Sequence, residues 1–318
     1  MKKLILALTL SALPALSQAP AGSKAAKPVE IQPFEVAALG KGGWFGRFGM
    51  TNCSWIDMGD GVLVIDTGAT VNDAANLAAQ IRETTKGKPI KWLVLTHLHS
   101  DSNTGVQAFL PTDATVFVNA KVAASVAMAL KGKEGQKLPT VVGVSDKIVV
   151  GVGTRVVHLG APAGAAHTDH DLYAFSVDHR ALFVGDLVTP GRCPMASDAT
   201  NDPRGWLEAL DRLDAANAAV VIASRGPESR LVQGEIGDTR SYLTRLIKLV
   251  TEYKNRKLPE AQVGAELAKL DPAGKYCPTQ LDNINGLALF RRVTPDGKFP
   301  PAPPPPVAPG AASAPKKK

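Results

Sequence analysis

Apolar residues recur along this chain in two alternating patterns, short runs of strand length and longer segments with helical spacing. The short runs predict strands over residues 31–37, 52–58, 62–66, 92–95, 115–118, 147–150, 155–159, 172–177, 181–184 and 219–223. The helical spacing predicts helices over residues 71–85, 103–110, 120–130, 204–215, 235–256, 259–269 and 281–292. Strand-rich halves before and after about residue 135 are each followed by helices. The pattern therefore predicts two similar αβ layers packed face to face.

Both ends of the chain depart from this alternation. Residues 1–21 begin with a lysine pair, continue with an apolar stretch too short to span a bilayer and end in small residues, which is typical of a secretory signal peptide. Residues 299–318 are a proline-rich, basic segment for which we expect disorder. We therefore expect one domain over residues 28–295, located in the periplasm or secreted, with no integral membrane segment in the mature protein.

The net charge of +7 at first suggests an anionic partner. Five of the seven excess positive charges, however, lie on lysines in the two end segments, and the part between them is nearly neutral. No run of Lys or Arg there has the clustering of a nucleic-acid-binding face. We therefore expect a small-molecule substrate rather than nucleic acid, and the sequence does not indicate an oligomeric state.

Three cysteines, Cys53, Cys193 and Cys277, allow one disulfide in an exported chain. None of them lies in a Cys-x-x-Cys pair, so their spacing excludes a zinc finger or a thioredoxin-like site. The spacing does not select a pair, and all three thiols being free is a further alternative.

The strongest chemical signal follows the predicted strand over residues 92–95. His97, His99 and Asp101 alternate there, so their side chains point to the same side as the strand ends. His167 lies in a loop of small residues, and Asp186 comes just after the predicted strand over 181–184. Imidazoles and carboxylates are ligands suited to zinc. A pair of hydrogen-bonded histidines at the edge of a core is the structural alternative.

Four pieces of the chain together resemble one known family. They are NCSWIDMGDGVLVIDTG (52–68), LVLTHLHSDSNTG (93–105), GAAHTDHDLYAFSVDHRALFVGDLV (164–188) and VVIASRGPES (220–229). In their order and spacing they resemble the metallo-β-lactamase superfamily of hydrolases over roughly residues 31–253. The resemblance implies a four-layer αβ/βα sandwich of mixed α/β class, with metal at the rim between the two sheets.

The resemblance also implies a ligand set. His97, His99 and His167 correspond to the first metal site, Asp101 to the second, and Asp186 to the bridging carboxylate. Two departures affect the second site, because Ser102 stands where many two-metal members have His, and Arg225 where the late motif usually supplies His. We therefore expect one tightly bound zinc ion and a second site that is weak or absent.

Zinc on three imidazoles lowers the pKa of its bound water to about 7 and polarises carbonyl or phosphoryl oxygens. The leading hypothesis is thus an exported zinc hydrolase in which metal-bound hydroxide attacks an ester, thioester, lactam or phosphate bond. Asp101 would orient and deprotonate the water, and Asp186 would support it. The alternative is a zinc-binding or substrate-binding protein of the same fold with little turnover.

Four further residues bear on the metal site or on the substrate. Arg225 is interpreted either as a salt-bridge partner that replaces the missing ion's charge or as a binding group for a substrate anion. Trp44, in a glycine-rich segment where β-lactamase relatives carry a flap, is a candidate substrate contact or a sheet-packed hairpin residue. His170 is a loop residue or a substitute ligand. Thr189 replaces a lysine that holds the drug in the family's β-lactamases, which disfavours lactam hydrolysis as the main activity.

Overall fold

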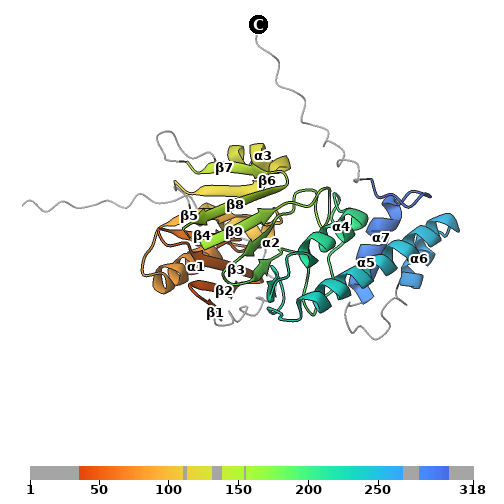
Figure 1. Cartoon of the computed structure of the whole chain (residues 1–318). Coiled ribbons are helices and arrows are strands. Elements are labelled where there is room, and N and C mark those ends of the chain that lie inside the picture. Colours follow the sequence, from red (N-terminus) through yellow and green to blue (C-terminus); the bar gives the residue numbers. More distant parts are fainter. Residues whose placement is uncertain (1–35, 110–112, 131–137, 154, 268–278, 301–318) are drawn as a thin grey trace, which may run out of the picture. The chain divides into compact units, whose positions relative to one another are not determined.

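The computed structural model describes residues 36–109, 113–130, 138–153, 155–267 and 279–300 (Figure 1). Internal contacts divide the chain into residues 1–32 and residues 33–318, and every structural statement below concerns the second unit. The predicted signal peptide lies outside the described residues, as does the predicted tail from residue 301 onward. No helix among the described residues has both the length and the apolar character needed to cross a membrane.

Seven strands form the first sheet, arranged in chain order. They are β1 (Val36–Gly40), β2 (Gly43–Phe48), β3 (Thr51–Asp57), β4 (Val62–Ile65), β5 (Ile90–Val94), β6 (Thr115–Asn119) and β7 (Thr140–Val144). The strands from β1 to β4 are antiparallel to their neighbours, and those from β4 to β7 are parallel. The parallel strands end at one edge of the sheet, so the loop after β5 lies at that edge.

Five strands form the second sheet, in the order β12, β11, β10, β9, β8. Their bounds are β8 (Lys147–Val152), β9 (Arg155–Gly160), β10 (Tyr173–Ser176), β11 (Ala181–Phe183) and β12 (Val220–Ile222). All neighbours are antiparallel except β11 and β12. The loop from β9 to β10 and the turn after β11 carry polar residues that the sequence singles out.

Helices flank both sheets. On the side of the first sheet are α1 (Val71–Thr84), α2 (Ser100–Asn103), the 3₁₀ turns η1 (Thr104–Phe109) and η2 (Ala120–Val122), and α3 (Ala123–Ala129). On the side of the second sheet are α4 (Pro203–Asp214), α5 (Val232–Asn255), α6 (Glu260–Leu267) and α7 (Thr279–Arg292). The helix α1 begins with a capping box, in which Thr70 and Asp73 bond each other's backbone amides.

Strand alternation distributes the side chains of each sheet between two cores. In β4, Leu63 and Ile65 enter a core shared with the second sheet, whereas Val62 and Val64 pack with α1. In β11, Phe183 enters the shared core and Leu182 packs with α4 and α5. Helices, sheet, sheet and helices therefore form four layers, which confirms the predicted αβ/βα sandwich.

Two strands, β2 and β7, are not among the strands predicted from the sequence, although a hairpin packed on the sheet was one of the two interpretations of Trp44. The glycine-rich segment around Trp44 forms the hairpin of β1 and β2, turned by Lys41 and Gly42 at positive φ angles of 50° and 80°. The strand β7 is not anticipated, because Gly143 interrupts its apolar pattern. A Cβ atom at Gly143 would lie 2.9 Å from the Ala120 Cα atom, so the glycine allows this edge strand to contact η2.

The cysteines divide into two classes. Cys53 is a free thiol, fully buried on β3, and burial raises its pKa. Cys193 is disulfide-bonded. It lies in the loop between β11 and α4, close to the polar residues that the next section describes.

The core shared by the two sheets allows a test of the layered packing. Leu63→Ala removes a fully buried side chain between the sheets, and we expect it to lower the free energy of unfolding by about 2–5 kcal/mol. Urea denaturation measures this change. Leu231→Ala is the matched control, because Leu231 is 75% exposed, and its effect should stay within about 0.5 kcal/mol. Equal effects of the two variants would contradict the assignment of Leu63 to the core.

Candidate metal centre

Two loops bring the three histidines together. His97 and His99 lie between β5 and α2, and His99 is the residue that precedes the first turn of α2. His167 lies in the loop between β9 and β10. The rings of His97 and His167 are completely buried, whereas His99 is partly exposed. These loops leave the sheets at neighbouring edges, so residues far apart in sequence face one another.

Asp186 joins this group from the turn after β11. The preceding Gly185 has a φ of 58°, and a Cβ atom there would lie 2.7 Å from the Thr96 Oγ1 atom. Glycine is therefore required for the turn to approach the loop of His97 closely. The Asp186 side chain is itself only 1% exposed, so its charge is removed from water.

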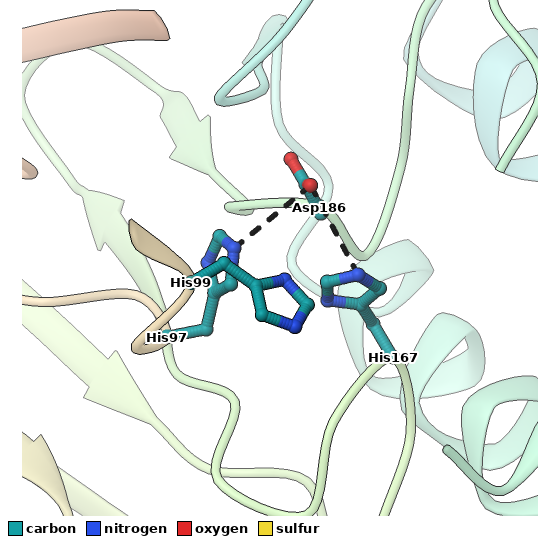
Figure 2. A group of neighbouring side chains, drawn as sticks. All are labelled: His97, His99, His167 and Asp186. Atoms are coloured by element: carbon teal, nitrogen blue, oxygen red, sulfur yellow. Dashed lines mark ion pairs between the residues drawn. The ribbon is translucent and has the colours of Figure 1, made fainter. Parts of the chain in front are cut away.

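The four side chains converge on one point (Figure 2). One ligand atom from each of His97, His99, His167 and Asp186 can be chosen so that all four lie within 4.8 Å of one another. The three rings are nearly perpendicular, with centroids 4.9 to 5.1 Å apart. The Asp186 Oδ2 atom lies 3.9 Å from Nε2 of both His97 and His167. The ligand atoms therefore face a common point, and at these distances Asp186 forms no hydrogen bond with either ring.

Hydrogen bonds define which nitrogen of His97 faces the group. Thr96 Oγ1 donates to Asp66 Oδ2 at 2.8 Å, so at 3.1 Å it accepts the proton of His97 Nδ1. The Nε2 atom is then the one that carries the lone pair. Burial lowers the pKa of His97 to about 4, so this ring is neutral at pH 7 and ready to bind a metal ion.

His167 has a carboxylate behind it instead. Its Nδ1 atom lies 3.5 Å from Asp171 Oδ1, and Asp171 is held in place by the amide and the hydroxyl of Thr168. Burial lowers the pKa of His167, but the interaction with Asp171 and the charge of Asp186 outweigh it, and the net shift is upward. Nε2 again faces the centre of the group.

The chemistry of these donors fits a metal ion. Nε2 of His97, Nε2 of His167 and both oxygens of Asp186 are buried, and within the described part of the chain none of them makes a hydrogen bond. An unsatisfied buried polar group costs about 1–3 kcal/mol, so four together at one point need a common partner. Three imidazoles and a carboxylate match the ligands that zinc takes in proteins.

A second metal ion fits less well. Arg225 lies between the two remaining carboxylates, since its Nη2 atom pairs with Asp101 Oδ2 and its Nε atom lies 3.3 Å from Asp186 Oδ2. Ser102 is fully buried and supplies no imidazole. Asp101 stands outside the four-residue group, at the neighbouring position. A guanidinium ion therefore supplies positive charge between these two carboxylates.

The group opens into a cleft of about 310 Å³. Beside the ligands, its walls include Asp101, Arg225, Met195 and Asp198. Trp44 is not among the lining residues, and instead it stacks on Trp55 at 6.3 Å on the side of the first sheet that faces α1. The His170 Nδ1 atom bonds Asp169 at 2.8 Å, and His170 is not part of the four-residue group.

Three acidic residues in or beside this site were not predicted from the sequence. Asp66 and Asp171 each stand within a motif quoted there, as part of Ile65-Asp66-Thr67 and His170-Asp171-Leu172, so the signal was present. Asp66 is buried at a φ of 59°, and burial raises its pKa to about 6 against four hydrogen bonds that lower it. Asp198, which bonds His99 Nε2 at 2.9 Å, belongs to no motif.

Comparisons with known proteins bear on the family to which the chain belongs. The family profile described as "Metallo-beta-lactamase superfamily" matches residues 46–225, which is more than half of the chain. A linear primary-alkylsulfatase of Pseudomonas sp. (strain ATCC 19151) is 22% identical over 214 residues, covering 54% of this chain. The chain spans only 40% of that relative's length.

Solved structures share the fold. A metallo-β-lactamase from Pontibacter korlensis superposes with a TM-score of 0.54 at 24% identity, covering 66% of this chain and 99% of the other. The mono-zinc form of the metallo-β-lactamase FIM-1 from Pseudomonas aeruginosa superposes with a TM-score of 0.55 at 20% identity. This match covers 67% of this chain and 96% of the other. The metallo-β-lactamase DIM-1 superposes with a TM-score of 0.53 at 16% identity, covering 67% of this chain and 97% of the other.

The carboxylate behind His167 leads to a prediction about pH. A proton must leave His167 before a metal can bind, so we expect zinc affinity to fall by about tenfold per pH unit below the raised pKa of this ring. Asp171→Asn should move this decline to lower pH, because the negative charge that raises the pKa of His167 is lost. Chelator competition from pH 5 to 9 measures both curves. An unchanged pH profile in the variant would contradict the role of Asp171.

Proposed function

This chain belongs to the metallo-β-lactamase superfamily, and from that premise we propose that it is a hydrolase dependent on a single tightly bound zinc ion. The observation that carries the proposal is the convergence of His97, His99, His167 and Asp186 on one point. Nε2 of His97, Nε2 of His167 and both oxygens of Asp186 are buried there and make no hydrogen bond within the described chain. When bound there, zinc supplies Lewis-acid activation of a water molecule and of the bond to be cleaved.

The carboxylates and the arginine of the cleft have separate roles in this proposal. Asp101 has one oxygen on Arg225, whereas Oδ1 is buried and makes no hydrogen bond to the described residues, so Oδ1 is free to orient a water molecule and take its proton. Asp186 belongs to the ligand set and lines the cleft. Arg225 keeps both carboxylates in place, which favours the salt-bridge interpretation of this residue over direct binding of a substrate anion.

The substrate class we propose is a small molecule with an ester, thioester, lactam or phosphate bond. The alkylsulfatase relative adds sulfate esters to these candidates. Thr189 donates to the Arg192 carbonyl at 3.2 Å and is buried, so nothing at this position replaces the drug-binding lysine of β-lactamases. We therefore place lactams last among the candidates.

We also propose that the protein is exported, to the periplasm or outside the cell. The disulfide at Cys193 supports this, because structural disulfides form and persist mainly in oxidising compartments. Residues 1–21, on which the prediction of a signal peptide rests, lie outside the described structure.

Metal content tests the single-ion proposal. We expect about one zinc ion per chain, measured by plasma mass spectrometry on protein purified without chelator. Arg225→His should raise the ratio towards about two, because it removes a cation between Asp101 and Asp186 and adds an imidazole. Arg230→His, a nearby substitution of the same kind outside the cleft, is the control. A ratio near two in the unmodified protein would overturn the single-ion proposal.

Catalysis is tested on a panel of ester, thioester, lactam, phosphodiester and alkyl sulfate substrates. We expect hydrolysis of at least one class, and its loss by a factor of about 10³ or more in His99→Ala, since a ligand is removed while the fold persists. Circular dichroism checks the fold. If the zinc-loaded protein cleaves no substrate class, the alternative of a zinc-binding or substrate-binding protein with little turnover replaces this proposal.

A further inference from the structure

The loop of residues 196–202, between β11 and α4, contacts the candidate metal centre without belonging to its ligand set. We name it the positioning loop. We infer that Asp198 in this loop is a positioning residue, which sets the tautomer of His99 so that Nδ1 faces the metal, and that α7 holds the loop in place. The inference rests on the proposed zinc site, and the supporting residues of α7 lie beyond the segment that the family profile matches.

The two oxygens of Asp198 have separate partners. Oδ1 accepts hydrogen bonds from the amide and the hydroxyl of Thr200, at 2.7 and 2.6 Å. Oδ2 is therefore left for His99 Nε2, at 2.9 Å. A carboxylate only accepts, so His99 must donate from Nε2, which leaves the lone pair on Nδ1. His99 is the most exposed of the three rings, and this bond fixes its orientation where packing does less.

The same loop also holds the segment of His167. Asn201 Nδ2 donates to the carbonyl of Ala166 at 2.6 Å, and the Asp202 amide donates to that carbonyl at 3.0 Å. Thr200 Oγ1 accepts from the Asp169 amide at 3.0 Å. One short loop thus connects the surroundings of two ligands that are 68 residues apart in the numbering.

The helix α7 supports the loop through two side chains. Arg292 Nη1 donates to the Asp198 carbonyl at 3.0 Å, and Nη2 donates to the carbonyl of Asn201. Asn285 is fully buried, and its amide bonds the backbone of Pro194 and Ala196 at 2.7 and 2.9 Å. Hence α7 takes part in shaping the ligand geometry, although it supplies no ligand itself.

The decisive variant is Asp198→Asn. An asparagine keeps the Oδ1 bonds to Thr200 but presents an N–H group to His99 Nε2, which favours the tautomer protonated at Nδ1. We expect the ring-nitrogen shifts of His99 in metal-free protein to report the inverted tautomer by ¹⁵N NMR. Zinc affinity, from chelator competition on the full chain, should fall about 10- to 100-fold.

Asp202→Asn is the matched control in the same loop. Asp202 caps α4 through the Arg204 amide, a role that asparagine also fills, and none of its hydrogen bonds involves His99. We expect it to keep the wild-type tautomer and zinc affinity. Wild-type values for both measurements in Asp198→Asn would overturn the inference.

A second pair of variants tests the contribution of α7. Arg292→Ala removes both bonds to the positioning loop, and we expect zinc affinity to fall about 3- to 10-fold. Arg291→Ala removes a neighbouring arginine that pairs with Glu260 at the surface, and it should have no effect. Equal zinc affinities in these two variants would overturn the role of α7.

The zinc-hydrolase proposal can fail independently of the role of Asp198. If wild-type protein binds no zinc, the proposal of a zinc hydrolase is wrong, whereas the tautomer of His99 in the metal-free protein still decides the role of Asp198. If wild-type protein binds zinc and Asp198→Asn inverts the tautomer, the role of Asp198 and the zinc site on which it rests are both supported, and the substrate panel decides the hydrolase proposal.

Discussion

One buried carboxylate, Asp66, connects the segments on which the site is built. At the end of β4 it accepts bonds from the amide and hydroxyl of Thr96, from the Asn103 amide group and from the Ser224 hydroxyl. Thr96 precedes His97, and Ser224 follows β12 of the other sheet and precedes Arg225. Burial disfavours the charged form of Asp66 and raises its pKa to about 6. The four hydrogen bonds offset part of the cost of burying this carboxylate. The edges of both sheets are thereby held at one place.

The same physical principle orients the histidines. Each ring has an oxygen acceptor behind one nitrogen, which is the Thr96 hydroxyl for His97, the Asp171 carboxylate for His167 and the Asp198 carboxylate for His99. A ring whose rear nitrogen donates a proton has its other nitrogen available as a ligand. Burial lowers the pKa of His97 to about 4, whereas the interactions of His167 with Asp171 and Asp186 outweigh burial and raise its pKa.

The segment that matches the superfamily and the helices that follow it contribute differently to this arrangement. The profile match ends at Arg225, and α5, α6 and α7 follow it. These helices bury the outer face of the second sheet, and α7 also reaches the loop that carries Asp198. The sheets hold three histidines and Asp186 at one edge, and the C-terminal helices shape the wall around them. Arg225, between two carboxylates, supplies the positive charge there.

The sequence by itself determined the alternation of strands and helices, the sandwich class and the group of His97, His99, His167 and Asp186, because these depend on short-range periodicity and on motifs with fixed spacing. It left Arg225 open between two roles and did not reveal Asp198, whose partner His99 is 99 residues away. It also missed β7, whose glycine weakens the apolar pattern. Only the tertiary structure showed the contacts of Arg225 with two carboxylates, the bond from His99 to Asp198 and the strand β7. Pairing between distant parts of the chain follows from how the layers pack and not from the spacing of neighbouring residues.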